Sequence, residues 1–229
     1  WTSLRADAAR AQFVGFDDVS VVDGSVQSFS IALNQQNGDP NGLVPHLADA
    51  PITILAGSRS FELDFDGADG RVLQVAADLT LSILDYFFLS GSFGFEFSKQ
   101  SIELSDGHTV ATNAVSVGVR GVDAFVGVGG PTNRPGAVGF GLTDANAALA
   151  VFTPTDTADL RSWLSLKADV ASGQLVGVNG LTASVSQLGV EINLGQGLGN
   201  NTVAHFADAP LQVIQGTGLS TLLDFDGAA

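Results

Sequence analysis

One block of sequence occurs twice in this chain, and no other feature limits the fold as strongly. Residues 1–16 read WTSLRADAARAQFVGF, and residues 163–178 read WLSLKADVASGQLVGV, an offset of 162. The similarity continues toward residue 229, because HLADAP returns as HFADAP at an offset of 159 and LDFDG returns unchanged at an offset of 160. Self-similarity of this length is typical of repeat proteins. We therefore expect residues 1–162 to form one complete repeat unit and residues 163–229 to form the first part of the next.

A weaker similarity divides the complete unit. The segments QFVGF, YFFLSG and AFVGVGG each follow a stretch rich in Ala, Val or Leu and each precede an alternating stretch. This pattern predicts three related β subunits at about 1–70, 71–107 and 108–162. In such an array each repeat buries its apolar end against its neighbour, so we interpret the chain as a segment of a longer protein.

Apolar and polar residues alternate along several stretches, and a period of two is typical of β-strands. Asp-Gly and Asn-Gly pairs such as Asp106-Gly107 separate these stretches and favour turns. Small residues at alternate positions, among them Gly94 and Gly118, are expected on the outward faces of the strands, where they would let a second layer of strands approach closely or would leave the surface smooth. We expect an all-β fold with little helix, an elongated tandem-repeat array that is β-solenoid-like or a continuous β-sandwich. The apolar members of three alternating stretches are Val75, Ala77, Leu79, Leu81 and Ile83, then Phe93, Phe95 and Phe97, then Val115, Val117 and Val119.

The charge of the chain argues against several classes of partner. There are 24 acidic and nine basic residues, which gives a formal net charge of −15 at pH 7. This surplus repels phosphate backbones, so we expect no nucleic-acid partner. No uninterrupted apolar run reaches the roughly 18–20 residues that span a bilayer, so we expect no membrane span. Cysteine is absent, and only two lysines are present, a composition that fits an extracellular or cell-surface location.

Acidic residues gather on Gly-containing turns in both copies. Oxygen ligands clustered in this way suit Ca²⁺, so calcium is the one cofactor that the sequence suggests. The alternative is that each turn is a solvated loop that closes a strand. The second copy reads DFDGAA and lacks the third acid of DFDGADG. The candidate calcium ligands are Asp64, Asp66, Asp69, Asp224 and Asp226.

Large aromatic residues mark the starts of the repeated segments. An exposed indole can stack on a sugar, but a large ring at the beginning of a unit can also seal the joint between neighbours. We favour the joint, and we expect Trp1, Trp163, Phe13 and Phe125 at the interfaces between repeats.

Both copies also contain a histidine followed by Ala-Asp-Ala-Pro. His46 with Asp49, and His205 with Asp208, could form a catalytic pair or an internal hydrogen bond that fixes a loop. No Gly-x-Ser-x-Gly or His-Glu-x-x-His motif accompanies them, so we expect the loop function and no enzyme activity.

The blocks WTSLRADAARAQFVGF, VLQVAADLTLSILDYFFLSGSFGFEFS and GAVGFGLTDANAALAVF resemble the tandem repeats of giant secreted or surface proteins of Gram-negative bacteria. Those proteins are adhesin-like and sometimes carry calcium-binding repeats-in-toxin segments. The resemblance implies an extracellular, tandemly repeated β-protein. It supplies no catalytic residue, and the glycine-rich calcium nonapeptide of repeats-in-toxin proteins is absent here.

These observations predict a structural or adhesive segment of a long extracellular filament or cell-surface protein. Its partners would be neighbouring repeats of the same or identical chains, stacked end to end, with a surface glycan as a further partner. One alternative is a module that binds polysaccharide or lipid in a groove lined by Phe93, Phe95 and Phe97. The other is a β-helix enzyme that acts on polysaccharide.

Overall fold

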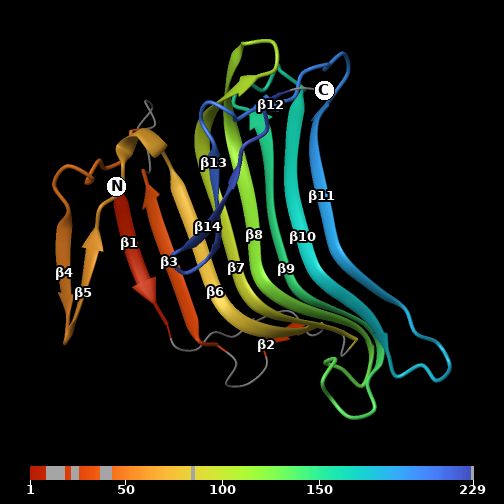
Figure 1. The fold of residues 1–229 in the computed structure, drawn as a ribbon. Helices are drawn as coiled ribbons and strands as arrows, with labels where there is room; N and C mark the ends of the chain where they lie inside the picture. Colours follow the sequence, from red (N-terminus) through yellow and green to blue (C-terminus); the bar gives the residue numbers. More distant parts are fainter. Residues whose placement is uncertain (9–18, 22–25, 37–42, 84–85, 228–229) are drawn as a thin grey trace.

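The structure is a computed structural model, and it describes residues 1–8, 19–21, 26–36, 43–83 and 86–227. Ten of the described strands form one antiparallel sheet, in the order β1-β3-β6-β7-β8-β9-β10-β11, with β2 beside β6 and β12 beside β7. Two further hairpins, β4–β5 and β13–β14, lie outside this sheet (Figure 1). The described helical structure is one short 3-10 helix, η1. The bounds are β1 (Thr2–Asp7), β2 (Val19–Val21), β3 (Ser28–Gln35), β4 (Ile52–Ala56), β5 (Arg59–Leu63), η1 (Gly67–Asp69), β6 (Val72–Ile83), β7 (Phe87–Leu104), β8 (Thr109–Val128), β9 (Val138–Pro154), β10 (Ser162–Val176), β11 (Ser184–Gln196), β12 (Ala204–His205), β13 (Leu211–Gly216) and β14 (Leu219–Leu223).

The prediction of an all-β fold with almost no helix is confirmed. Within the described residues, sequential strands from β6 to β11 pair as antiparallel neighbours, an arrangement that differs from the coils of a β-solenoid. The sheet formed by the described strands is open, with β1 and β11 as its two edges. The predicted Asp106-Gly107 turn joins β7 to β8, where Gly107 has a φ of 80° and donates its amide to the Leu104 carbonyl at 2.8 Å. The described helices include none with the length and hydropathy needed to span a bilayer.

The long central strands bend partway along their length (Figure 1). The pairing of β7 with β8 slips between Ser90 and Ser92, and that of β8 with β9 slips between Val119 and Ala124. Such bulges insert unpaired residues and increase the local twist. Gly121 has a φ of 57° at this point, a backbone conformation that glycine adopts without strain.

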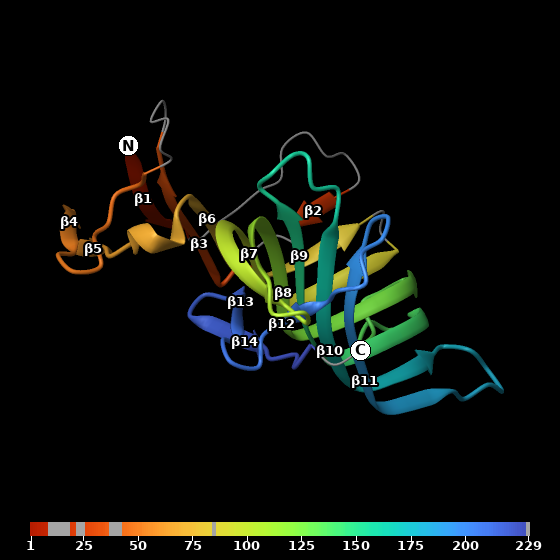
Figure 2. The ribbon, with the colours of Figure 1, turned by 90° about the horizontal axis from the view of Figure 1, so that it is seen from above.

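The two faces of the sheet differ in composition and in cover. The hairpin β13–β14 lies against one face, and Figure 2 shows it on one side of the sheet only. On that face a row of small residues crosses the strands, and all four of its members, Ala76, Gly94, Gly118 and Ala148, are buried. The opposite face carries the large apolar side chains that the alternation predicts, and most of these are half-buried or exposed. We call these the covered face and the apolar face.

The molecule has a large surface for its mass. The chain exposes 13272 Å², whereas a compact protein of 23.4 kDa exposes about 9,700 Å². The excess is about 3,500 Å², to which the apolar face and the exposed hairpin β4–β5 both contribute.

Candidate functional site

Residues 1–162 and residues 163–229, which we call the first and the second segment, meet along strands β9 and β10. These strands pair antiparallel in thirteen aligned positions, from Trp163 opposite Phe152 to Val176 opposite Gly139. The β9–β10 boundary therefore lies inside a continuous sheet, with β11 paired to the far edge of β10. This boundary is the candidate functional site, because it joins residues 1–162 to residues 163–229.

Trp163 is the largest fully buried side chain at the boundary. Its Nε1 donates to the Thr202 hydroxyl at 3.1 Å, and the Arg161 guanidinium lies 5.2 Å from the centre of its ring. Asp159 holds that guanidinium at 2.7 Å, and this hydrogen bond raises the pKa of Arg161 and lowers the pKa of Asp159. The buried cluster around the indole consists of Ile102, Leu104, Ala114, Ala148, Ala150, Phe152, Trp163, Ala204, Phe206, Val213 and Leu223. The core of the molecule thus combines side chains from both segments.

Trp1 occupies the aligned position at the start of the first segment, and its surroundings differ. The indole is 78% exposed, although its Nε1 donates to the Leu43 carbonyl at 3.0 Å. Strand β1 pairs with β3 on one side, as β10 pairs with β11. No described strand pairs with the other side of β1. In the part of the chain that the structure describes, no strand lies beside Trp1 as β9 lies beside Trp163.

The hairpin β13–β14 is seated on the covered face by two glycines. A Cβ atom built on Gly94 or on Gly118 would lie 2.2 Å from the Ile214 carbonyl oxygen, so only glycine permits this approach. Next to it, the Gln215 amide donates to the carbonyls of Val119 at 3.0 Å and of Ala147 at 3.2 Å. The hairpin of the second segment is therefore fixed to β8 and β9 of the first. These two glycines meet the expectation that small residues admit a second layer.

The aligned hairpin β4–β5 has no comparable contact with the face of the sheet among the described residues. All five residues of β4 are exposed, and Figure 2 places this hairpin beside β1 at the end of the molecule. Ile54 is 46% exposed, while Val213, the aligned residue in β13, is fully buried. Leu55 is 79% exposed, while Ile214 is half-buried against the glycines. The two hairpins differ mainly in whether a sheet lies under them.

Internal contacts are repeated in the two segments. Ser donates to Asn across the first strand pair, and this Asn donates to a backbone carbonyl in the loop that follows. The bridges are Ser3 to Asn34 (2.8 Å) and Asn34 to the Pro45 carbonyl (2.9 Å), and Ser165 to Asn193 (2.9 Å) and Asn193 to the Ala204 carbonyl (2.8 Å). Sequence reasoning missed both asparagines, although they are related by the offset of 159.

The acids that were candidate calcium ligands make ion pairs and turn contacts. Asp64 pairs with Arg5 and Asp224 pairs with Lys167, and each cation also lies over the aromatic residue that follows the acid. The Lys167 hydrogen bond lowers the pKa of Asp224. Asp66 accepts from the Ala68 amide at 2.8 Å as the cap of η1. The acids thus lie in two separate loops.

Within the described ranges, no three acidic or histidine side chains gather where they could hold a metal ion. Asp69 lies at the end of η1, and burial, with a smaller effect of Asp66, raises its pKa. The backbone carbonyl of Asp226 lies 2.6 Å from His205 Nδ1. No contact between the described residues supports calcium binding.

The two histidines connect loops in both segments. His46 has Nε2 at 3.1 Å from Asp49 and Nδ1 at 3.0 Å from Asp66, and the hydrogen bond to Asp49 makes the largest contribution to raising its pKa. His205 has Nε2 at 3.5 Å from Asp208, and its pKa is raised first by its hydrogen bond to the Asp226 backbone. This geometry matches the expected loop function.

Of the two phenylalanines predicted at the interface, the structure describes Phe125. Phe13 is outside the described residues. Phe125 is buried beside Phe88, with ring centres 6.3 Å apart, and its ring also approaches Gly130 and Gly139. All these contacts lie within residues 71–162, and Gly139 is also the last aligned position of the β9–β10 boundary.

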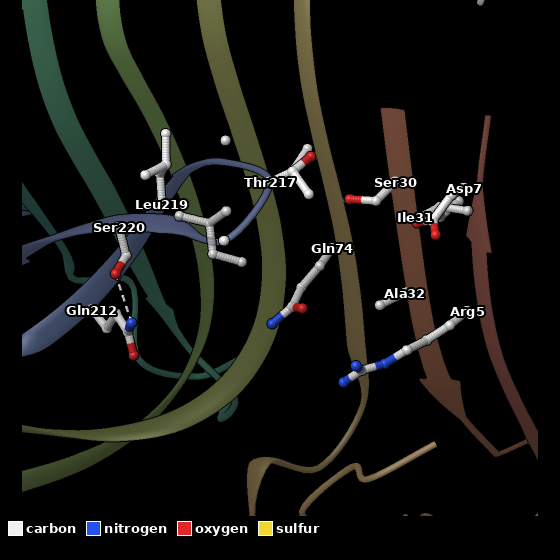
Figure 3. Close-up of a pocket in the computed structure, with 14 residues that line it drawn as sticks. Arg5, Asp7, Ser30, Ile31, Ala32, Gln74, Gln212, Thr217, Leu219 and Ser220 are labelled. Carbon is white, nitrogen blue, oxygen red and sulfur yellow. Dashed lines mark hydrogen bonds between the residues drawn. The ribbon is translucent and has the colours of Figure 1, made fainter. Parts of the chain in front are cut away.

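A groove of about 400 Å³ runs along the covered face beside the hairpin β13–β14. Figure 3 shows Arg5 and Gln74 extending from β1 and β6, with Gln212 bonded to Ser220 on the hairpin. The groove does not contain Phe93, Phe95 and Phe97, the residues proposed for a ligand groove. These three side chains lie on the apolar face, because Gly94 between them faces the hairpin.

Comparison with known proteins adds no relative. No family model, no curated protein and no solved structure matches this chain.

Proposed function

We propose that this chain is a structural segment of a long extracellular or cell-surface protein, built from tandem units that join edge to edge. Residues 1–162 are one unit in this proposal, and residues 163–229 begin the next. Each unit adds its first strand to the sheet of the unit before it and lays its hairpin on the covered face of that unit. The biological role is then to provide length and stiffness, with adhesion as a further property of the whole protein.

One observation carries the proposal. The aligned segments make the same internal contacts, namely the Ser-Asn bridge, the cation beside the Asp-Phe pair and the histidine between two loop segments. They differ in what lies next to them, since Trp163 is buried by β9 and Trp1 is 78% exposed. A unit that is internally complete but leaves a large ring exposed at one edge is suited to receive a preceding unit.

The geometry gives the length that each unit would add. Six strands of the main path, β1, β3, β6, β7, β8 and β9, precede the strand β10 that restarts the pattern. Neighbouring strands are separated by about 4.8 Å, so each unit of 162 residues extends the sheet by about 29 Å. The acidic, lysine-poor and cysteine-free composition supports an external location for such an array.

The proposal is tested by extending the 229-residue chain at its N-terminus with one, two and three further copies of residues 1–162. Small-angle scattering and electron microscopy should give a maximum dimension that grows by about 29 Å per copy, before any correction for twist. Melting temperature should rise with the first copies and then level off, because each added unit adds one interface while the array always keeps two exposed ends. Separate compact beads that melt independently of copy number would overturn the proposal.

A further inference from the structure

We propose that the apolar face of the ten-stranded sheet packs against the same face of a second copy of this chain, which forms a two-layered sandwich. This contact is lateral, and it is distinct from the lengthwise joining of units along the sheet. It would cover the apolar face, which the described residues of one chain leave open.

The apolar face is continuous across the main strands. The register of pairing places its side chains in three transverse rows, two of eight residues and one of seven. None of the 23 residues is polar or charged. The rows are Leu4, Leu33, Leu73, Phe97, Val115, Val151, Leu164 and Leu194; Ala6, Ile31, Val75, Phe95, Val117, Leu149, Leu166 and Ile192; and Phe29, Ala77, Phe93, Val119, Ala147, Ala168 and Val190.

The side chains of the apolar face are more exposed than apolar side chains normally are. Of the 23 side chains only Ala77 is buried, and Phe95, Val117 and Val190 are 37%, 39% and 40% exposed. The covered face, in contrast, buries polar residues such as Ser165 completely. Monomeric soluble proteins rarely expose contiguous apolar patches larger than a few hundred Å². A face of this extent is therefore an interaction surface.

The exposed area of the molecule leaves room for a contact between two chains. The molecule exposes about 3,500 Å² more than a compact protein of its mass, and part of this excess lies on the apolar face. Obligate homodimers bury about 2,000–5,000 Å² in total, shared between the two copies. Sheets that pack face to face lie about 10 Å apart, close enough to exclude water between the rows.

The repetition of the face identifies the partner as a second copy. Aligned residues of the two segments fall on the same face, as Leu4 and Leu166 do, and as Leu33 and Ile192 do. A partner must then offer apolar side chains at the same interval along its whole length. Another chain with the same repeat meets this requirement at every unit.

Shape also favours self-association. Strand β7 contributes a ridge of phenylalanines, and the neighbouring strand β8 contributes the smaller Val115, Val117 and Val119. A two-fold axis between β7 and β8 places the phenylalanine ridge of each copy over the valine strip of the other. Large residues then oppose small ones, which is how sheet faces reach the packing density of a protein core.

A lipid surface is a poorer match for this face. The chain has nine basic residues against 24 acidic ones, so anionic headgroups would repel it. Interfacial proteins place Trp and Tyr at the headgroup level. Here Trp163 lies on the covered face, where it is buried in the core cluster, and the exposed Trp1 and Tyr86 lie outside the three apolar rows. The uncharged face and the acidic remainder fit a protein partner with the same face.

The test is the mass of the 229-residue chain in solution, measured by sedimentation at micromolar concentrations. We expect a dimer with twice the 23.4 kDa chain mass. Val117→Glu should weaken association at least about 100-fold, because it places an unpaired carboxylate in the sandwich. The control Gln212→Glu adds the same charge to the exposed hairpin and should leave the dimer intact. Far-UV circular dichroism checks that each variant is folded.

A second measurement does not depend on the folding of the Val117→Glu variant. The chain contains no cysteine, so Val117→Cys and Gln212→Cys each introduce a single thiol. A short bismaleimide should link two chains through position 117 and not through position 212. A chain that sediments as a monomer, with or without lipid vesicles, would overturn the lateral contact. So would a dimer that Val117→Glu leaves unaffected and that the bismaleimide links through position 212. None of these results bears on the growth in length per unit, which tests the proposed function separately.

Discussion

Replacing each tryptophan by alanine compares two aligned residues whose neighbours differ. Trp163 is fully buried in the core cluster and donates to Thr202, whereas Trp1 is 78% exposed. Truncation of a buried tryptophan costs about 3–5 kcal/mol, through lost transfer free energy and the cavity that remains. Truncation of an exposed side chain changes stability by about 0.5 kcal/mol or less. We therefore expect Trp163→Ala to lower the free energy of unfolding by about 3–5 kcal/mol and Trp1→Ala to change it little.

The assay is equilibrium urea unfolding of both variants and of the unaltered chain, followed by far-UV circular dichroism. Circular dichroism is preferred to fluorescence because each variant lacks one of the two indoles. The slope of free energy against urea should stay constant if the unfolded states are equivalent. Equal losses in the two variants would refute the reasoning, because the two positions would then have equivalent packing whatever lies beside them.

Three further predictions concern the hairpin seat and the loops. Gly118→Ala should destabilise the fold by about 1–3 kcal/mol, because its Cβ meets the hairpin backbone at 2.2 Å, whereas Gly189→Ala, with nothing within 4 Å, should change the urea midpoint little. Gln215→Leu should cost about 1–3 kcal/mol in the same assay through two lost hydrogen bonds, and an unchanged midpoint would contradict the seat. The folded state raises the pKa of His46 and of His205, so their contribution to stability is complete below the ordinary value of about 6.5 and is lost as pH rises through the raised values. Replacing both by Asn should reduce the stability difference between about pH 6 and about pH 8, and an unaltered difference would exclude the two histidines as its source.

Much of the fold could be predicted from local pattern. The alternation in β6, β7 and β8 predicted strands because a period of two puts like residues on one face of a sheet. The Asp106-Gly107 turn followed from the tolerance of glycine for positive φ. The pattern could not predict which face is covered. Apolar side chains normally mark the inner face, but here Gly94 and Gly118 are buried while Phe95 and Val117 are exposed.

The boundary between segments was only partly accessible to sequence reasoning. Trp163 was found because it recurs at the repeat offset. Gln215 was missed because the aligned residue in the first copy is Ala56, so nothing repeats at that position. Its bonds to Val119 and Ala147 span 96 and 68 residues, and such contacts depend on how the hairpin is placed on the sheet. The suggestion of calcium rested on the spacing of the acids and stays a prediction; the ion pairs of Asp64 with Arg5 and of Asp224 with Lys167 could not be read from that spacing.

The most direct test of edge-to-edge joining uses Trp1 as a reporter. One further copy of residues 1–162 is placed before the 229-residue chain, and every tryptophan except Trp1 of that chain is replaced by phenylalanine. The matched control is the 229-residue chain with Trp163→Phe. The account predicts that the added copy shifts the emission of Trp1 to the blue and protects it from acrylamide, as its ring enters surroundings like those of Trp163. Emission and quenching equal to those of the control would contradict the account, because the added unit would then leave the edge of β1 uncovered.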